Sequence, residues 1–312
     1  MRYILEKYNG SKTRFDCPKC NGKKTFTKYI DIELNEYLGD HVGRCNKVDK
    51  CEYHFKPKQF FADNKDYTHV YKPQQMNVAP PKKAMFTIPI EQLDATLTQY
   101  DSNNFALILL KLFDYNDAVK LLTLYEIGTS KKWGGATIFW QIDANGIVRT
   151  GKIMLYNVET NKRVKQPYDH ISWVHKDILT DTHELKQCFF GEHLINKFKS
   201  KPIAIVESEK SAIICSYFLP EYVWLSAGNI NGLSIEKFKV LSGRKVVLFP
   251  DLNKGFEIWQ QKANEFKHLA EVSISNYLQR IATKEQQANG LDLADYLIET
   301  ITKNVAYVQN VT

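Results

Sequence analysis

Two short apolar segments that each end in a carboxylate constrain the fold of this chain most strongly. Residues 203–206 (Ile-Ala-Ile-Val) run directly into Glu207, and residues 245–249 (Lys-Val-Val-Leu-Phe) are followed, after a proline, by Asp251. Such short apolar runs are typical of buried parallel strands. The carboxyl ends of parallel strands meet at one edge of the sheet, where open α/β sheets bind ligands. Two carboxylates at that edge predict a hard-oxygen site for Mg²⁺ or Mn²⁺.

The patterns around these segments predict four regions. Over 196–312, strand and helix patterns alternate, which predicts a mainly parallel sheet with flanking helices. Residues 96–195 predict a smaller mixed α/β subdomain, with helices near 105–112 and 116–125 and a β-hairpin, 136–142 and 147–156, around an Asn-Gly turn. Residues 63–95 are polar and rich in proline, which predicts a linker. Residues 1–62 form a separate cysteine module.

Four of the six cysteines predict a zinc site. Cys17 and Cys20 form a metal knuckle, and Cys45 and Cys51 follow across a predicted β-hairpin. Four thiolates favour tetrahedral Zn²⁺, with no open position for catalysis. Because the second pair is widely spaced, His54 or His41 could replace one cysteine. The other two cysteines, Cys188 and Cys215, stand in apolar contexts and are expected to be buried core thiols.

The positive charge of the chain is concentrated in the cysteine module. Residues 1–58 hold 13 Lys/Arg against 8 Asp/Glu, which is most of the formal net charge of +7. Lys24, Lys28 and Arg44 are interleaved with aromatic residues, and such surfaces follow phosphates and stack unpaired bases. We therefore expect single-stranded nucleic acid as a ligand, with a merely solvated basic surface as the alternative. No membrane span or signal peptide is recognised, so a cytoplasmic location is expected.

The segment Val206-Glu207-Ser208-Glu209-Lys210-Ser211-Ala212 resembles the first motif of the Toprim fold, the catalytic module of bacterial-type DNA primases, topoisomerases and some nucleases. The resemblance implies that Glu207 acts in metal-dependent phosphoryl transfer. It also maps the family's Asp-x-Asp motif onto Asp251-Leu252-Asn253, with Gly228 and Gly255 as the accompanying glycines.

The order of the regions extends this resemblance. Bacterial primases likewise place a zinc ribbon first, then a mixed α/β subdomain and then a Toprim domain. The chain resembles the short primase-like Toprim proteins of Bacteroidetes genomes and their mobile elements. The middle hairpin resembles a primase segment that lies near nucleic acid, which implies that Arg149 and Lys152 face nucleic acid or nucleotide. The expected fold class is therefore α/β: a zinc ribbon, a mixed subdomain and a Toprim-type sheet.

One position departs from the family pattern. The second acid of Asp-x-Asp is Asn253, whose neutral oxygen can bind Mg²⁺ or Mn²⁺ but adds no charge, so metal binding should be weaker. Asp292 and Asp295 could compensate. Their ordinary interpretation is acids at a helix N-terminus.

The resemblance implies a primase-like enzyme. It would bind single-stranded DNA and polymerise nucleoside triphosphates into primers during replication of a bacterial or mobile element, with a replicative helicase as a candidate partner. Glu207 and Asp251 would be its catalytic residues. Two alternatives stay open: a non-catalytic replication or transfer accessory with a degenerate Toprim site, which Asn253 favours, and a Toprim nuclease, against which the zinc ribbon argues.

Overall fold

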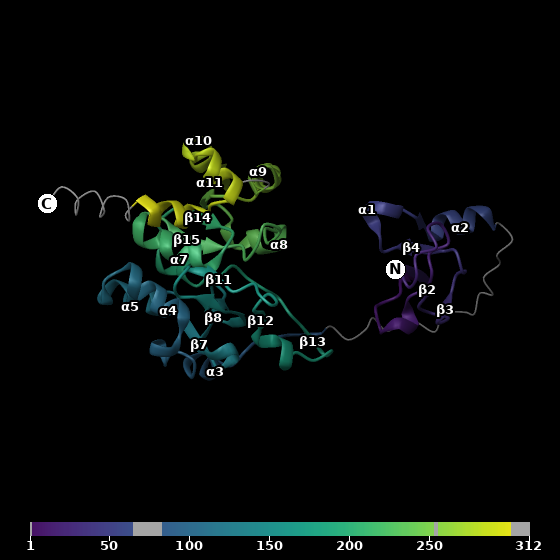
Figure 1. Cartoon of the computed structure of the whole chain (residues 1–312), viewed down its shortest axis with the longest axis horizontal. Coiled ribbons are helices and arrows are strands. Elements are labelled where there is room, and N and C mark those ends of the chain that lie inside the picture. Colours follow the sequence, from purple (N-terminus) through teal and green to yellow (C-terminus); the bar gives the residue numbers. More distant parts are fainter. Residues whose placement is uncertain (1, 65–82, 253–254, 301–312) are drawn as a thin grey trace. The chain divides into compact units, whose positions relative to one another are not determined.

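The computed structural model describes residues 2–64, 83–252 and 255–300 and divides the chain into two compact units, Met1–Pro80 and Pro81–Thr312 (Figure 1). Within these described ranges, the helices are all too short or too polar to cross a bilayer. Most of the predicted linker, 63–95, lies outside the described residues, because residues 65–82 are not described. Beyond them, Phe86, Ile88 and Leu93 are buried in the second unit.

The first unit is a small antiparallel sheet around the cysteines. Its elements are β1 (Tyr3–Leu5), β2 (Phe26–Asp31), β3 (Glu36–Tyr37), β4 (Gly43–Cys45), α1 (Val48–Cys51), β5 (His54–Phe55) and α2 (Pro57–Asp63). β2 pairs with β1, β3 and β4, and β4 pairs with β5. The predicted hairpin between the cysteine pairs is therefore present, and it brings the two pairs together.

The second unit begins with a mixed α/β region. Its elements are β6 (Ala84–Met85), α3 (Ile90–Asp94), α4 (Asn104–Leu112), α5 (Tyr115–Leu124), β7 (Ile127–Ser130), β8 (Ala136–Ile142), β9 (Val148–Met154), β10 (Tyr156–Asn157), β11 (Lys162–Arg163), β12 (Ile171–Trp173), β13 (His183–Glu184) and α6 (Leu194–Lys197). An antiparallel sheet in the order β12-β9-β8-β7 is its framework. The predicted helices and hairpin are confirmed.

Local side-chain bonds explain how this region folds. Asn103 caps α4, since its Oδ1 accepts hydrogen bonds from the backbone N–H of Phe105 (3.1 Å) and Ala106 (3.2 Å). At the hairpin turn, Asp143 Oδ1 accepts from the N–H of Asn145 and Ile147, and Gly146 takes φ +80°. Asp143 and the Asn-Gly pair thereby fix the register of β8 and β9.

A four-stranded parallel sheet follows. Its elements are β14 (Ile203–Val206), α7 (Glu209–Phe218), β15 (Val223–Ser226), α8 (Ile235–Phe238), β16 (Lys245–Leu248), α9 (Gly255–Phe266), β17 (Glu271–Ile274), α10 (Tyr277–Ile281) and α11 (Lys284–Asn289). The strand order is β15-β14-β16-β17, with all pairs parallel. The predicted α/β fold with flanking helices and an N-terminal β-ribbon is thus confirmed.

The strand order creates a switch point between β14 and β16. After β14 the chain adds β15 on one side through α7, and it then returns to add β16 on the other side. Open α/β sheets leave a crevice at the carboxyl ends of the two strands where the order reverses. Glu207 follows one of these strands and Asp251 follows the other, so topology alone brings both to the crevice.

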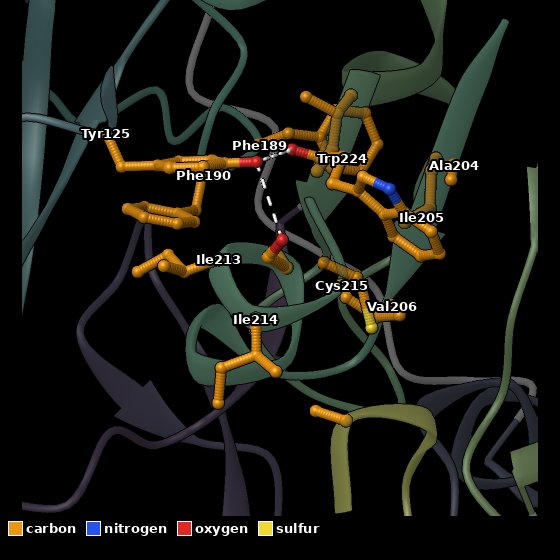
Figure 2. Close-up of a cluster of buried hydrophobic side chains, with 14 of the residues drawn as sticks. Tyr125, Phe189, Phe190, Ala204, Ile205, Val206, Ile213, Ile214, Cys215 and Trp224 are labelled. Atoms are coloured by element: carbon orange, nitrogen blue, oxygen red, sulfur yellow. Dashed lines mark hydrogen bonds between the residues drawn. The ribbon is translucent and has the colours of Figure 1, made fainter. Parts of the chain in front are cut away.

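One buried tyrosine links the mixed region to the parallel sheet. Tyr125, at the end of α5, is fully buried, and its hydroxyl donates to the carbonyl of Trp224 in β15 (3.1 Å) and that of Ala212 in α7 (3.4 Å) (Figure 2). Phe190 stacks on Tyr125, with ring centroids 5.3 Å apart. The two regions therefore share one hydrophobic core, to which α4, α5 and the parallel sheet all contribute.

Candidate functional site

The four N-terminal cysteines form a zinc-binding cluster. Their Sγ atoms all lie within 4.8 Å of one another. The Cys17–Cys51 pair is 3.7 Å apart and the Cys20–Cys45 pair is 3.9 Å apart. Tetrahedral zinc with Zn–S bonds of about 2.3 Å places its sulfurs about 3.8 Å apart, which matches these two distances, so the arrangement fits a zinc ion. His54 instead bonds the Tyr29 hydroxyl through Nε2 at 2.9 Å, so the geometry supports four cysteine ligands.

The thiol of Cys17 is prepared for deprotonation. Burial opposes the thiolate, but hydrogen bonds from the backbone of Cys20 and Lys19 and from the thiols of Cys20 and Cys51 together lower the pKa of Cys17 to about 7. The neighbouring Cys51 keeps its proton instead, because burial raises its pKa to about 12. Zinc binds thiolates, so this environment favours metal capture near neutral pH.

We expect Cys45→Ser to lose its zinc and to loosen the first unit alone. Structural zinc in small modules contributes on the order of 10 kcal/mol to folding, and one lost thiolate removes much of it. Elemental analysis should show about one zinc in the unsubstituted protein and little in the variant. All five tryptophans lie between Trp133 and Trp259, so thermal unfolding followed by tryptophan fluorescence should be unchanged.

Cys188→Ser is the matched control for this prediction. Cys188 is a buried cysteine of the second unit and belongs to no metal-binding cluster in the described ranges. This variant should keep its zinc. If Cys45→Ser retains a full equivalent of zinc, Cys45 is not a ligand.

The three basic residues predicted to contact nucleic acid in the first unit have different environments. Lys24 and Arg44 are exposed. Lys28 is mostly buried: its Nζ donates to Asp40 Oδ1 at 2.6 Å and lies 4.0 Å from the centroid of the Phe15 ring. Lys24 and Arg44 are therefore available to a ligand, whereas Lys28 already has internal partners.

In the second unit, Glu207 and Asp251 lie together at the switch point. The backbone N–H of Asp251 donates to Glu207 Oε1 at 3.4 Å, and both residues line one pocket of about 580 Å³. A Cβ on Gly255 would lie 2.5 Å from Glu207 Oε1, so a larger residue at this position would displace the carboxylate from its present place. The structure thus explains the glycine after Asp-x-Asp. Asn253 itself lies outside the described residues.

Two further acids approach from the C-terminal residues. Asp292 Oδ1 accepts the N–H of Asp295 at 2.7 Å, which is the N-terminal cap of the helical residues 293–300, and its Oδ2 accepts from Ser211 Oγ at 2.6 Å. Asp295 accepts from Lys210 Nζ at 2.6 Å, and that nitrogen is 4.0 Å from Asp292. Asp292 therefore caps this helix, and Asp295, in its first turn, lines the pocket with Glu207 and Asp251.

The four carboxylates repel one another in a partly buried setting. Burial, followed by the charges of Asp292 and Glu207, raises the pKa of Asp251 to about 9. Burial also raises the pKa of Glu207. Excess negative charge on hard oxygens suits a divalent cation, so the donor set fits Mg²⁺ or Mn²⁺. In the described ranges, however, only the four cysteines bring three or more ligand atoms within 4.8 Å, so these acids are not gathered as a closed cage.

Replacing Asp251 should stabilise the metal-free protein in a pH-dependent way. A carboxyl whose pKa is raised by folding must stay protonated in the folded state while the unfolded chain releases its proton. The free energy of unfolding therefore falls as pH rises from about 4 to about 9, and this loss is a penalty on the folded state. Asp251→Asn removes this penalty. Its melting temperature should match that of the unsubstituted protein near pH 4 and exceed it at pH 8, by calorimetry in chelator. An equal difference at both pH values would contradict the assignment.

A buried ion pair beside these acids was not predicted. Lys152 Nζ donates to Glu209 Oε1 (3.1 Å), to Glu209 Oε2 (3.2 Å) and to the carbonyl of Gly228 (2.8 Å). Lys152 is 7% exposed and Glu209 is 1% exposed. The pair joins β9 to the start of α7, and Lys152 reaches the pocket edge already engaged. Sequence spacing gave no signal for it, since the partners are 57 residues apart.

Arg149, predicted to face nucleic acid, also has an internal partner. Its Nε and Nη2 donate to Asp143 Oδ2 at 2.9 and 2.7 Å, and its side chain is 13% exposed. The pair braces the β8–β9 turn. Lys152 and Lys210 also line the pocket but already have carboxylate partners. The further cations in its lining are Lys162, Arg163 and Lys165, around β11, a segment that the sequence analysis did not single out.

Two family models match parts of the chain. Residues 103–252 match the model described as a domain of unknown function (DUF6371). Residues 1–66 match the model of a zinc beta-ribbon finger, in agreement with the four-cysteine geometry. Among curated proteins, no sequence matches the chain.

Three similar solved structures are primases. The primase fragment of the bacteriophage T7 primase-helicase protein is 11% identical, covers 89% of this chain and 98% of its own, and has a TM-score of 0.38. The zinc-binding and RNA polymerase domains of the Aquifex aeolicus primase are 12% identical. The match covers 97% of this chain and 85% of that one, with a TM-score of 0.38. The RNA polymerase domain of Mycobacterium tuberculosis primase DnaG is 9% identical. The match covers 64% of this chain and 80% of that one, with a TM-score of 0.41. The predicted resemblance to bacterial-type primases is therefore confirmed as a similarity of structure.

Proposed function

We propose that this protein is a primase-like nucleotidyltransferase that binds single-stranded DNA and joins ribonucleotides at the Glu207–Asp251 pocket. The observation that carries the proposal is the mixed lining of that pocket, in which carboxylates that fit a divalent cation lie alongside the cations of 162–165. Carboxylates suit the metal and cations suit the phosphates of a nucleoside triphosphate.

In this proposal each group has one role. Glu207 and Asp251 would hold Mg²⁺ or Mn²⁺, and the bound cation would supply Lewis-acid stabilisation of the negative charge on phosphate oxygens. Lys162, Arg163 and Lys165 pair with the triphosphate. The Lys152–Glu209 pair positions β9 against α7 and so fixes the distance between the basic segment and the acids.

The first unit supplies nucleic-acid affinity in this proposal. The zinc ribbon exposes Lys24 and Arg44, which would contact phosphates of single-stranded DNA. We also propose the division of the chain into the regions 1–62, 63–95, 96–195 and 196–312. A cytoplasmic location and a helicase partner are part of the same proposal.

A second candidate function is supported by Lys210. Its ammonium group already neutralises part of the acid cluster through Asp295, and the neutral Asn253 replaces an acid in the sequence. Both features reduce the demand for a divalent cation. They favour a nucleic-acid-binding accessory protein without turnover.

Incorporation of labelled ribonucleotides on a single-stranded DNA template, with Mg²⁺ and separately with Mn²⁺, distinguishes the two candidates. Primer synthesis by the unsubstituted protein supports the enzyme. Template binding without synthesis under either metal supports the accessory protein, and metal-dependent degradation of the template would indicate a nuclease.

A further inference from the structure

Three aromatic rings form a short column on the mixed region of the second unit. Tyr168 stacks on His170 with centroids 4.4 Å apart and planes 19° apart, and the ring of Trp133 meets His170 edge-on at 5.2 Å. His170 is 8% exposed, whereas Tyr168 is 57% exposed. One face of the tyrosine ring is therefore covered by the imidazole, and the ring remains largely open to solvent.

Two features of this column raise the free energy of the folded state. Trp133 takes φ +56°, a left-handed conformation that is rare for a bulky residue and is often retained at functional sites. In the described residues, His170 Nδ1 is a buried nitrogen without a hydrogen-bond partner. Trp133 also packs against the hydrophobic cluster of the mixed region, and Trp133 and His170 together hold the flat ring of Tyr168 at the surface.

The column adjoins the pocket through a continuous run of backbone. Lys165 lines the pocket, and Tyr168 follows three residues later. Leu155, beside β9, ties the two ends of this run together, because its carbonyl accepts from Val164 and its N–H donates to the carbonyl of His170. Hydrogen bonds thus anchor the segment between the pocket cations and the exposed ring at both ends.

Positive charge surrounds the same surface. Lys131, two residues before Trp133, and Lys176, six residues after His170, are exposed. Lys132 is fixed by bonds to Ser172 (3.1 Å) and Asp177 (3.5 Å). An aromatic face flanked by cations is the arrangement that binds unpaired nucleotides, in which bases stack and phosphates pair with ammonium groups.

We infer that Tyr168 is a stacking platform for an unpaired base of the single strand that passes the Glu207–Asp251 pocket. The inference rests on the proposed function, since it names a residue that would hold the proposed nucleic acid next to the proposed site. It assigns Tyr168 to nucleic-acid binding rather than to catalysis, with His170 and Trp133 positioning its ring.

The test uses the full chain and a short single-stranded oligonucleotide carrying 2-aminopurine, without metal or nucleotide. Binding should quench the fluorescence of a stacked 2-aminopurine. Tyr168→Ala should weaken binding about 5- to 100-fold, the range for one stacked base, and abolish the quenching. Tyr168→Phe keeps the flat ring and should retain both. The dependence of affinity on salt should be the same for Tyr168→Ala as for the unsubstituted chain, because no phosphate contact is removed.

Tyr115→Ala is the matched control, because Tyr115 is an exposed tyrosine of the same unit in α5, outside the column. It should bind normally. If Tyr168→Ala binds and quenches as the unsubstituted chain does, the inference is wrong while the proposed function stands. If the unsubstituted chain binds no single strand, both are wrong.

Discussion

Glu207→Gln is expected to abolish primer synthesis while the second unit stays folded. The substitution keeps the shape of the side chain and its contact with the Asp251 backbone, but it removes the charge that holds the cation. Loss of one preorganised electrostatic group in an active site lowers the rate about 10²- to 10³-fold. Because burial raises the pKa of Glu207, the neutral variant should be at least as stable as the unsubstituted protein. Primer length on denaturing gels and the melting temperature measure the two effects.

Glu271→Gln is the control for this experiment. Glu271 is an exposed glutamate in β17 of the same sheet, so its replacement should change neither synthesis nor melting. If Glu207→Gln retains more than a tenth of the activity, about 1.4 kcal/mol of barrier, Glu207 does not hold an essential metal. Activity restored to the variant by Mn²⁺ in place of Mg²⁺ would instead show that Glu207 is one ligand among several.

The residues that sequence analysis placed best are those whose position follows from topology. Glu207 and Asp251 end parallel strands, and strand order then decides where they lie, so the pattern of apolar runs was sufficient. The four cysteines are a similar case, because the predicted hairpin brings the two pairs together. In both cases a short local pattern and one rule of chain connection determine the site.

Side chains whose role depends on a distant partner could not be placed in this way. Lys152 and Arg149 were predicted to face nucleic acid because the middle hairpin resembles a primase segment. In the structure β9 is covered along most of its length, so the alternation of inward and outward residues is no guide. Lys152 meets Glu209, and Arg149 meets Asp143. The type of a residue does not reveal which charge it will meet across the fold.

The segment around β11 illustrates the opposite failure. Residues 158–170 contain no apolar periodicity, and the sequence analysis made no prediction for their basic residues. The structure folds β10 and β11 into a small hairpin and brings Lys162, Arg163 and Lys165 to the acids. Only the tertiary fold connects this loop with strand ends more than forty residues later.

Removing one partner of the Lys152–Glu209 pair should strongly destabilise the second unit. Lys152→Met leaves Glu209 buried with an uncompensated charge, and breaking such a pair typically costs about 3–5 kcal/mol. The double variant Lys152→Met/Glu209→Leu removes both charges and should recover most of that loss. Urea unfolding followed by tryptophan fluorescence measures these changes, because all five tryptophans belong to the second unit.

The exposed pair Lys245–Glu271 provides the comparison that isolates burial. Its charged atoms are 4.0 Å apart, and its side chains are 73% and 74% exposed. Lys245→Met should therefore cost less than about 1 kcal/mol. If Lys152→Met costs no more than Lys245→Met, the pair does not join β9 to α7. If the double variant is as unstable as the single one, the loss comes from packing or from the Gly228 contact rather than from an isolated charge.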